Sequence, residues 1–91
     1  MIRKFPLGHV VATPGALTAL AAAGHAPQEF LDRHQQADWG ELDEDDCREN
    51  ERSLKDGCRL LSAYRLRDST KIWIITEADR SATTILLPEE Y

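Results

Sequence analysis

The sequence predicts an α+β fold in which a helical hairpin and one acidic helix pack on a three-stranded antiparallel β-meander. Three runs rich in β-branched and aromatic residues, at positions 60–66, 72–76 and 83–87, are separated by polar segments. A small sheet needs one face covered, and the amphipathic segments upstream are the apolar material that remains to cover it. The segment 8–13, which contains Val10 and Val11, can add a short N-terminal edge strand.

One domain is expected. The chain has 91 residues, and domains of this length bury roughly 60–65% of the surface that the unfolded chain exposes. We therefore expect residues 1–91 to form a single α+β domain. Its core is expected to contain Val10, Val11, Leu17, Leu20, Phe30, Leu54, Leu61, Ile72, Ile74, Ile85 and Leu87.

Two short helices are predicted in the first half of the chain. Thr13 can cap the first of them, and Pro14 stands at its first position, where a missing N–H costs nothing. Gly24 is placed to end this helix, and Pro27 begins a second helix over 27–35. Together they form a helical hairpin. The second helix carries no net positive charge on its exposed side, which disfavours a DNA-reading helix-turn-helix.

A third helix is predicted over 44–56, with Asp43 as its cap and Gly57 as its end. Positions 38–56 hold nine acids and three bases, a balance of −6 in a chain whose net charge is −5. The first function hypothesis is therefore a non-enzymatic interaction protein whose acidic helix docks on the basic surface of a larger partner. The residues expected to bind that partner are Asp43, Glu44, Asp45, Asp46, Glu49 and Glu51.

Direct nucleic-acid binding through the sheet is an alternative. Its candidate residues are Arg59, Arg65, Arg67 and Lys71, with Tyr64 or Trp73 as a stacking surface. The three arginines have the same parity, so strand alternation places them on the face opposite Tyr64. The acidic balance of the chain disfavours this function, because neutralisation of phosphates supplies most of the affinity of nucleic-acid binders.

A small enzyme is a second alternative. Glu77, Asp79 and Arg80 form a polar turn in which carboxylates could transfer protons and the arginine could orient an anion. Ser62 and Ser81 are candidate nucleophiles, but no Gly-x-Ser-x-Gly elbow accompanies them. The sequence therefore favours a protein without catalytic activity.

No metal or cofactor is expected. The acidic run after Gly40 lacks the glycine position of a calcium loop, and the three histidines and two cysteines lack the close spacing of zinc ligands. The scattered glycines form no phosphate-binding loop. Helical rise separates Cys47 and Cys58 too far for a disulfide, so both are expected to be free thiols. Without a signal peptide or membrane span, a cytoplasmic protein is expected.

The segments FPLGHVVATPGAL, ADWGELDEDDCRENE and LLSAYRLRDSTKIWIITEADRSATTILLPEEY resemble a family of small bacterial proteins carried on plasmids and integrative elements. Some members are labelled as restriction-modification related. The resemblance covers nearly the whole chain and implies an accessory protein of a mobile element, of unknown biochemical activity. It favours a host defence or DNA-processing enzyme as the partner. A methyltransferase is excluded, because the chain is too short and has no S-adenosylmethionine motif.

Overall fold

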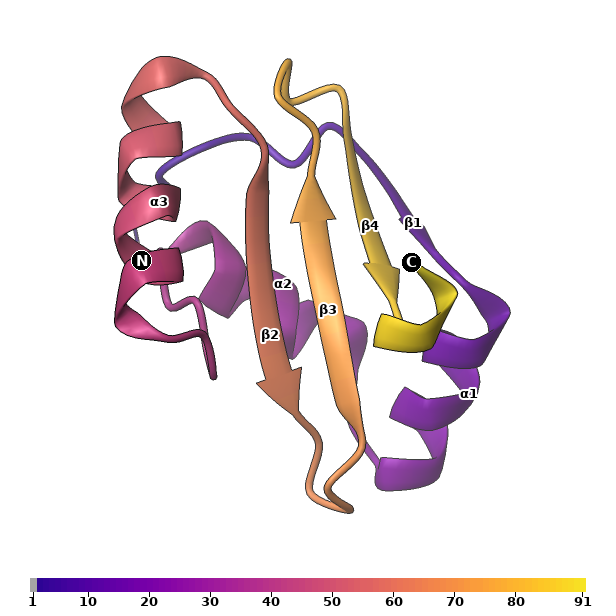
Figure 1. Cartoon of the computed structure of the whole chain (residues 1–91). Coiled ribbons are helices and arrows are strands. Elements are labelled where there is room, and N and C mark those ends of the chain that lie inside the picture. The colour runs from indigo at the N-terminus through magenta and orange to yellow at the C-terminus, as the bar shows by residue number, and fades with distance from the viewer. Residues whose placement is uncertain (1) are drawn as a thin grey trace.

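The computed structural model describes residues 2–91 and has an α+β fold, as the sequence predicts. The strands form one four-stranded sheet, and Figure 1 shows α2 behind it, α1 toward the β1 side and α3 beside β2. In chain order the elements are β1 (His9–Ala12), α1 (Pro14–Ala23), α2 (Pro27–Gln35), α3 (Glu44–Asp56), β2 (Leu60–Arg65), β3 (Lys71–Thr76), β4 (Ala82–Leu86) and a 3-10 turn, η1 (Pro88–Glu90).

The sheet has the order β1-β4-β3-β2. Strands β2, β3 and β4 form the predicted antiparallel meander, with Ser62 opposite Ile74 and Ile74 opposite Ile85. The short N-terminal edge strand that the sequence allowed is present, and only its direction goes beyond the prediction. The N-terminal segment does add a fourth strand, and it runs parallel to β4, so the sheet is mixed. The N–H groups of His9 and Thr13 donate to the carbonyls of Ser81 and Ile85.

The helix boundaries follow from local chemistry. The Thr13 hydroxyl accepts a hydrogen bond from the N–H of Ala16 at 3.1 Å, and Pro14 opens α1. The Asp43 carboxylate accepts from the N–H of Asp46 at 2.8 Å and caps α3 in the same way. Gly57 ends α3 in the left-handed conformation, at φ 71°. Each of these ends is confirmed as predicted.

The main core lies between the sheet and the hairpin of α1 and α2. Leu20, Phe30, Ile72, Ile74 and Ile85 are buried there as predicted. Other predicted core residues are less buried. Leu54, Leu61 and Leu87 are half-buried, and Val10, Val11 and Leu17 have exposed fractions of 40%, 41% and 49%.

The exposure of the valines has a simple cause. They belong to β1, which is the outermost strand of the sheet and, within residues 2–91, pairs with β4 alone. Leu17 lies at the flank of the buried side of α1, which is formed by Ala16, Leu20 and Ala23, and the sheet does not extend far enough to cover it. The sequence predicted these elements correctly but could not show which of their sides the rest of the chain would leave uncovered.

The outer edge of β2 is closed by side-chain and loop groups. The buried side chain of Asn50 in α3 donates to the carbonyl of Leu61 at 2.6 Å and accepts from its N–H at 3.1 Å. Next to it, Ala63 donates to the carbonyl of Trp39 and accepts from the N–H of Glu41. These bonds satisfy the free groups that an edge strand otherwise presents to other chains.

Candidate functional site

The face of the sheet opposite the hairpin is only partly covered. Successive side chains of a strand point to opposite faces, so the register places Leu61, Ala63, Trp73 and Ile75 together on this open face. Leu86 of β4 lies opposite Trp73 and joins them. The C-terminal segment crosses one part of this face, with the Tyr91 ring edge-on to Trp73 at a centroid distance of 5.7 Å. We call this surface the open face.

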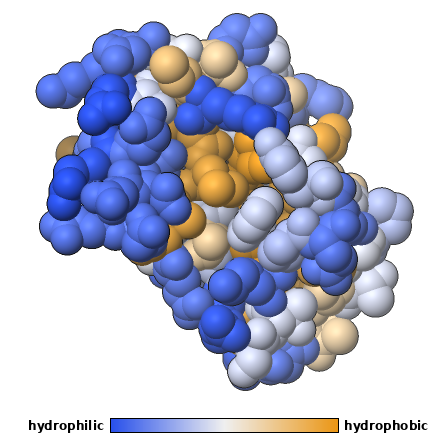
Figure 2. Space-filling model, viewed as in Figure 1, coloured by the Kyte–Doolittle hydropathy of each residue, from blue (hydrophilic) through white to orange (hydrophobic). Residues whose placement is uncertain are grey.

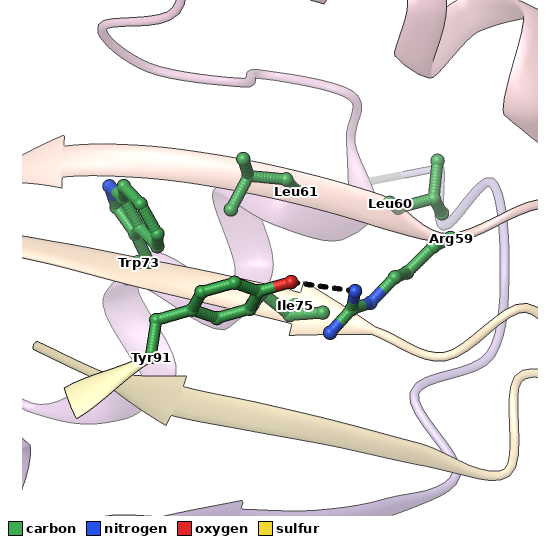
Figure 3. Close-up of a pocket in the computed structure, with 6 residues that line it drawn as sticks. All are labelled: Arg59, Leu60, Leu61, Trp73, Ile75 and Tyr91. Carbon is green, nitrogen blue, oxygen red and sulfur yellow. Dashed lines mark hydrogen bonds between the residues drawn. The ribbon is translucent and has the colours of Figure 1, made fainter. Parts of the chain in front are cut away.

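An apolar groove lies on the open face. Its volume is about 290 Å³, and it is lined by Arg59, Leu60, Leu61, Trp73, Ile75 and Tyr91. Figure 3 shows the Tyr91 ring lying across Ile75, with Trp73 at one end of the groove and Arg59 at the other. In Figure 2 the same area is a hydrophobic patch between the hydrophilic surface over α3 and the C-terminal segment.

One polar interaction organises the rim of the groove. Arg59 Nη1 donates to the Tyr91 hydroxyl at 2.9 Å, and the guanidinium lies 5.4 Å from the centroid of the same ring. Arg59 Nε is also 3.8 Å from the Glu77 carboxylate. These contacts hold Tyr91 over the sheet, although 69% of its surface is exposed. The groove therefore has an apolar floor and a single charged end.

The first turn of α3 brings together most of the predicted acidic residues. Asp43 is used as the helix cap. Glu44 and Asp45 both pair with Arg48, at 3.2 and 3.3 Å. Asp46 is exposed. The acidic surface of this turn is therefore partly neutralised by an arginine of the same helix.

Further along α3, Glu49 pairs with Arg52 at 2.9 Å. The Glu51 carboxylate accepts a hydrogen bond at 2.8 Å from Nε1 of the buried Trp39. Arg48, Arg52 and Lys55 follow one another at helical spacing along the side of α3 opposite Asn50. The predicted acidic surface is thus divided by a row of bases on the outermost side of the helix.

Three of the four predicted nucleic-acid-binding residues share the open face. Arg65 lies opposite Lys71 in the β2–β3 register, on the same side as Trp73, while Tyr64 is buried on the other side. Arg59 lies at the rim of the groove. Arg67 follows β2 and donates to the His25 ring and to the carbonyl of Gly24. Trp73, rather than Tyr64, is therefore the aromatic residue that accompanies the bases.

In the turn between β3 and β4, the side chains of Asp79 and Arg80, which the sequence offered as catalytic candidates, make hydrogen bonds that stabilise the fold. Arg80 donates to the carbonyls of Ser53 and Cys58, at 3.0 and 2.5 Å, and to two carbonyls of its own turn. The Asp79 carboxylate accepts from the N–H of Ser81, and hydrogen bonding first by the side chain and then by the main chain of Ser81 lowers the pKa of Asp79. The guanidinium of Arg80 therefore ties α3 to the turn, and both of its Nη atoms are already hydrogen-bonded to main-chain carbonyls.

A buried chain of hydroxyl groups surrounds His34. Its Nδ1 is 2.5 Å from the Ser62 hydroxyl and its Nε2 is 2.9 Å from the Thr76 hydroxyl. The Thr76 hydroxyl contacts that of Thr83, which donates to the carbonyl of Leu7 at 2.7 Å. The single O–H of Thr83 donates its hydrogen bond to this carbonyl, so the Thr76 hydroxyl must be the donor in its contact with Thr83. The Thr76 oxygen therefore accepts a hydrogen bond from His34 Nε2. His34 thus carries its proton on Nε2 and accepts from Ser62 at Nδ1.

The hydrogen-bonded groups around His34 stabilise the fold, and the Ser62 hydroxyl is not placed to act as a nucleophile. His34 and Ser62 both have an exposed fraction of 0%, so no substrate reaches the Ser62 hydroxyl. Both ring nitrogens are occupied by hydroxyl groups, which leaves no position for an orienting carboxylate. Burial, with a smaller effect from the charge of Arg80, lowers the pKa of His34 to about 3. The imidazole is therefore neutral over the physiological range.

Within residues 2–91 no three His, Cys, Asp or Glu side chains gather as a metal site would require. Cys47 and Cys58 are free thiols, as predicted. Over the same residues, no helix has the length and apolar character needed to cross a membrane.

Sequence reasoning missed the groove and the His34 chain. The segment 72–75 is apolar at every position, which is more than a sheet covered on one face needs. The apolar residues at both alternating sets of positions could have predicted apolar side chains on the open face as well as in the core. The role of Tyr91 could not be predicted from the sequence, because it depends on how η1 turns the chain back over β3.

We compared the chain with protein-family models, curated proteins and solved structures, and no significant match was found in any of the three comparisons.

Proposed function

We propose that this protein is a non-enzymatic interaction module that holds an apolar side chain of a larger protein in the groove on the open face. The observation that carries the proposal is the apolar floor of that groove, formed by Leu61, Trp73 and Ile75. Ile75 is buried at the bottom of the groove and Leu61 and Trp73 are half-buried along it, and a concave apolar site with a few polar groups at its rim is typical of a binding site. The groove also lacks a pair of groups that could transfer protons, because Arg59 and Tyr91 are its only ionisable lining residues.

The lining residues are of the types that dominate binding energy. Trp, Tyr and Arg are the residues most enriched at interface hot spots, and here all three line one groove. The ring of Tyr91 is already held by Arg59 and Trp73. Because the site is organised before binding, little conformational entropy is lost when a partner side chain enters it.

Charge indicates the chemistry of the partner. The groove is bordered by α3 (Figure 2), which lies in the segment 38–56 with its balance of −6. A partner that presents an apolar side chain among Lys and Arg residues would complement both surfaces. The acids of α3 would then accelerate the encounter and select the partner, while the groove would supply most of the affinity. The resemblance to element-carried proteins favours a host defence or DNA-processing enzyme, since such enzymes have basic surfaces.

Panning a library of random displayed peptides against the protein tests this proposal. The expected result is enrichment of peptides with a large apolar residue flanked by Lys or Arg. Replacing Tyr91 by serine removes one wall of the groove and is expected to weaken binding of an enriched peptide by about tenfold or more. Tyr91→Phe is the matched control: it keeps the ring, so its effect is expected to stay within about threefold.

The Tyr91 position suits this test because its side chain is exposed, so neither variant should unfold the domain. Enrichment of acidic peptides, or equal loss of binding in the serine and phenylalanine variants, would count against the groove as the docking site.

A second candidate function has its own supporting observation. Arg65 and Lys71 lie side by side on the open face with Trp73, an arrangement that could place phosphates on the bases and a nucleobase on the indole. Single-stranded oligonucleotides should then bind with strong salt dependence. The double variant Arg65→Ala, Lys71→Ala is expected to reduce the slope of log affinity against log salt by about one unit or more. No binding at low salt, or an unchanged slope, would exclude this function.

A further inference from the structure

The outer edge of β1 is unpaired. His9 and Thr13 direct their N–H groups to β4, so the main-chain groups of Val10 and Ala12, which alternate with them, point away from the sheet. β1 is the last strand in the sheet order, and among residues 2–91 only β4 pairs with it. Two N–H and two C=O groups are thus available to another strand.

The two edges of the sheet differ. At the β2 edge, Asn50 and the segment 39–41 take up the outward-facing groups of Leu61 and Ala63. At the β1 edge, within residues 2–91, no side chain or loop takes up the outward-facing main-chain groups of Val10 and Ala12. Because natural proteins usually cover or charge an edge strand, the open β1 edge is expected to pair with another chain.

The segment that contains β1 and α1 is apolar and carries no charge of its own, and the carboxylate of Glu90, which accepts from the Thr13 hydroxyl at 2.6 Å, lies beside their junction. Of the five exposed large hydrophobic side chains that the structure describes, three are Val10, Val11 and Leu17. No Asp, Glu, Lys or Arg occurs anywhere in the segment 5–28. The exposed positions of α1 are correspondingly uncharged and include Thr18, Ala21 and Ala22. Since 30% of the residues in the whole chain are charged, the lack of charged residues in this segment distinguishes it from the rest of the sequence.

We infer that the β1 edge is a homodimer interface, in which the β1 strands of two copies pair antiparallel across a two-fold axis. With Val11 opposite Val11 of the second copy, Val10 and Ala12 exchange hydrogen bonds with Ala12 and Val10 across the axis. An antiparallel pair of identical strands is self-complementary, as a two-fold interface requires. The result is one continuous sheet of eight strands.

The self-complementary strand edge favours a second copy, and the charge distribution permits it. Each copy carries a net charge of −5, so two copies repel each other through most of their surface. Because the segment 5–28 carries no charged residue, pairing along β1 and the Leu17 side of α1 brings two copies together where their own strands and helices place no like charges opposite one another. A stable interface buries about 800 Å² on each partner, out of 5167 Å² here. Four strand residues do not supply that area, so the side of α1 that carries Leu17 must contribute.

This interface is independent of the groove. The groove is lined from β2, β3 and the C-terminal segment, and β1 is at the opposite edge of the sheet. The two proposals also respond differently to salt. Added salt screens the repulsion between like-charged copies and should strengthen the dimer, whereas it should weaken binding of a basic partner in the groove. Failure of either proposal can therefore be distinguished from failure of the other.

Sedimentation equilibrium of the full chain tests the inference. The expected wild-type mass is twice 10.3 kDa. Val11→Lys places two like charges directly opposite each other at the axis and is expected to raise the dissociation constant by about tenfold or more. Gln28→Lys adds the same charge on an exposed position of α2 and should leave the dimer intact. A monomer at about 100 μM protein, or a dimer unaffected by Val11→Lys, would overturn the inference.

Amide hydrogen exchange supplies a readout that does not depend on a variant. In the dimer the N–H groups of Val10 and Ala12 are hydrogen-bonded to the second copy, so their exchange should slow as protein concentration rises. The N–H of Thr13 donates to Ile85 within one chain and is the internal reference. Exchange at Val10 and Ala12 that is fast and independent of concentration would contradict β1 pairing.

Discussion

Replacing Gly40 by alanine is expected to lower the free energy of unfolding by ~3 kcal/mol. Gly40 has a φ of 76°, a conformation that residues with a Cβ rarely adopt. A Cβ at this position would also overlap the main-chain carbonyl of Ala63, where the segment 39–41 bonds to the edge of β2. The strand and the segment would have to separate. Chemical denaturation of the variant measures the loss.

Gly57→Ala is the matched control for this prediction. Gly57 has a similar φ of 71°, but a Cβ there would have no neighbour within 4 Å. This variant should therefore show the conformational penalty alone, ~1 kcal/mol. The difference between the two variants isolates the close approach of Gly40 to β2. Equal losses would mean that the segment 39–41 does not lie against the strand.

Lowering the pH from 7.5 to 4.5 is expected to remove ~3 kcal/mol from the free energy of unfolding through His34 alone. Burial lowers the pKa of His34 from 6.5 to about 3 in the folded protein. Between these values the unfolded chain binds a proton that the folded protein does not. The contribution of His34 to the free energy of unfolding is therefore fully present above pH 6.5. Below pH 6.5 the free energy of unfolding falls by about 1.4 kcal/mol per pH unit.

The pH range separates this effect from that of the carboxylates. Arg33 lowers the pKa of Asp38 from 3.8, so the contribution of Asp38 is lost only at lower pH. His34→Gln should flatten the dependence of stability on pH between 7.5 and 4.5, whatever its effect at neutral pH. His9→Gln changes an exposed histidine and should keep the wild-type slope. A steep slope that persists in His34→Gln would show that another group is responsible.

The sequence predicted the elements of the fold well because each has a local cause. Thr13 and Asp43 are caps, Pro14 and Pro27 open helices, and Gly57 ends one. The parallel pairing of β1 with β4 has no such local cause. It joins His9 to Ala82 across the whole chain and depends on the path of the intervening helices. The exposure of Val10 and Val11 follows from that pairing and was missed for the same reason.

The candidate site was less predictable than the fold. Strand alternation correctly separated Arg65 from Tyr64, but only the register with β3 places Trp73 on the side of Arg65. The acids of α3 were visible in the sequence, and the four-residue spacing of Glu44 and Arg48 predicts the ion pair that the structure contains. Glu51 has the same spacing from Lys55 but accepts a hydrogen bond from Trp39 instead, which only the fold could show. His34 gave no signal, because its partners Ser62 and Thr76 come from two distant strands.

The most direct test of groove binding is a nuclear magnetic resonance titration of the labelled protein with a peptide enriched by panning. The predicted result is a set of shifted resonances from Leu61, Trp73 and Ile75, including the indole N–H of Trp73, with the buried indole of Trp39 unmoved. In the Tyr91→Ser variant the same shifts should require about tenfold more peptide. Shifts confined to α1 and α2, with Trp73 unaffected at saturation, would contradict binding on the open face.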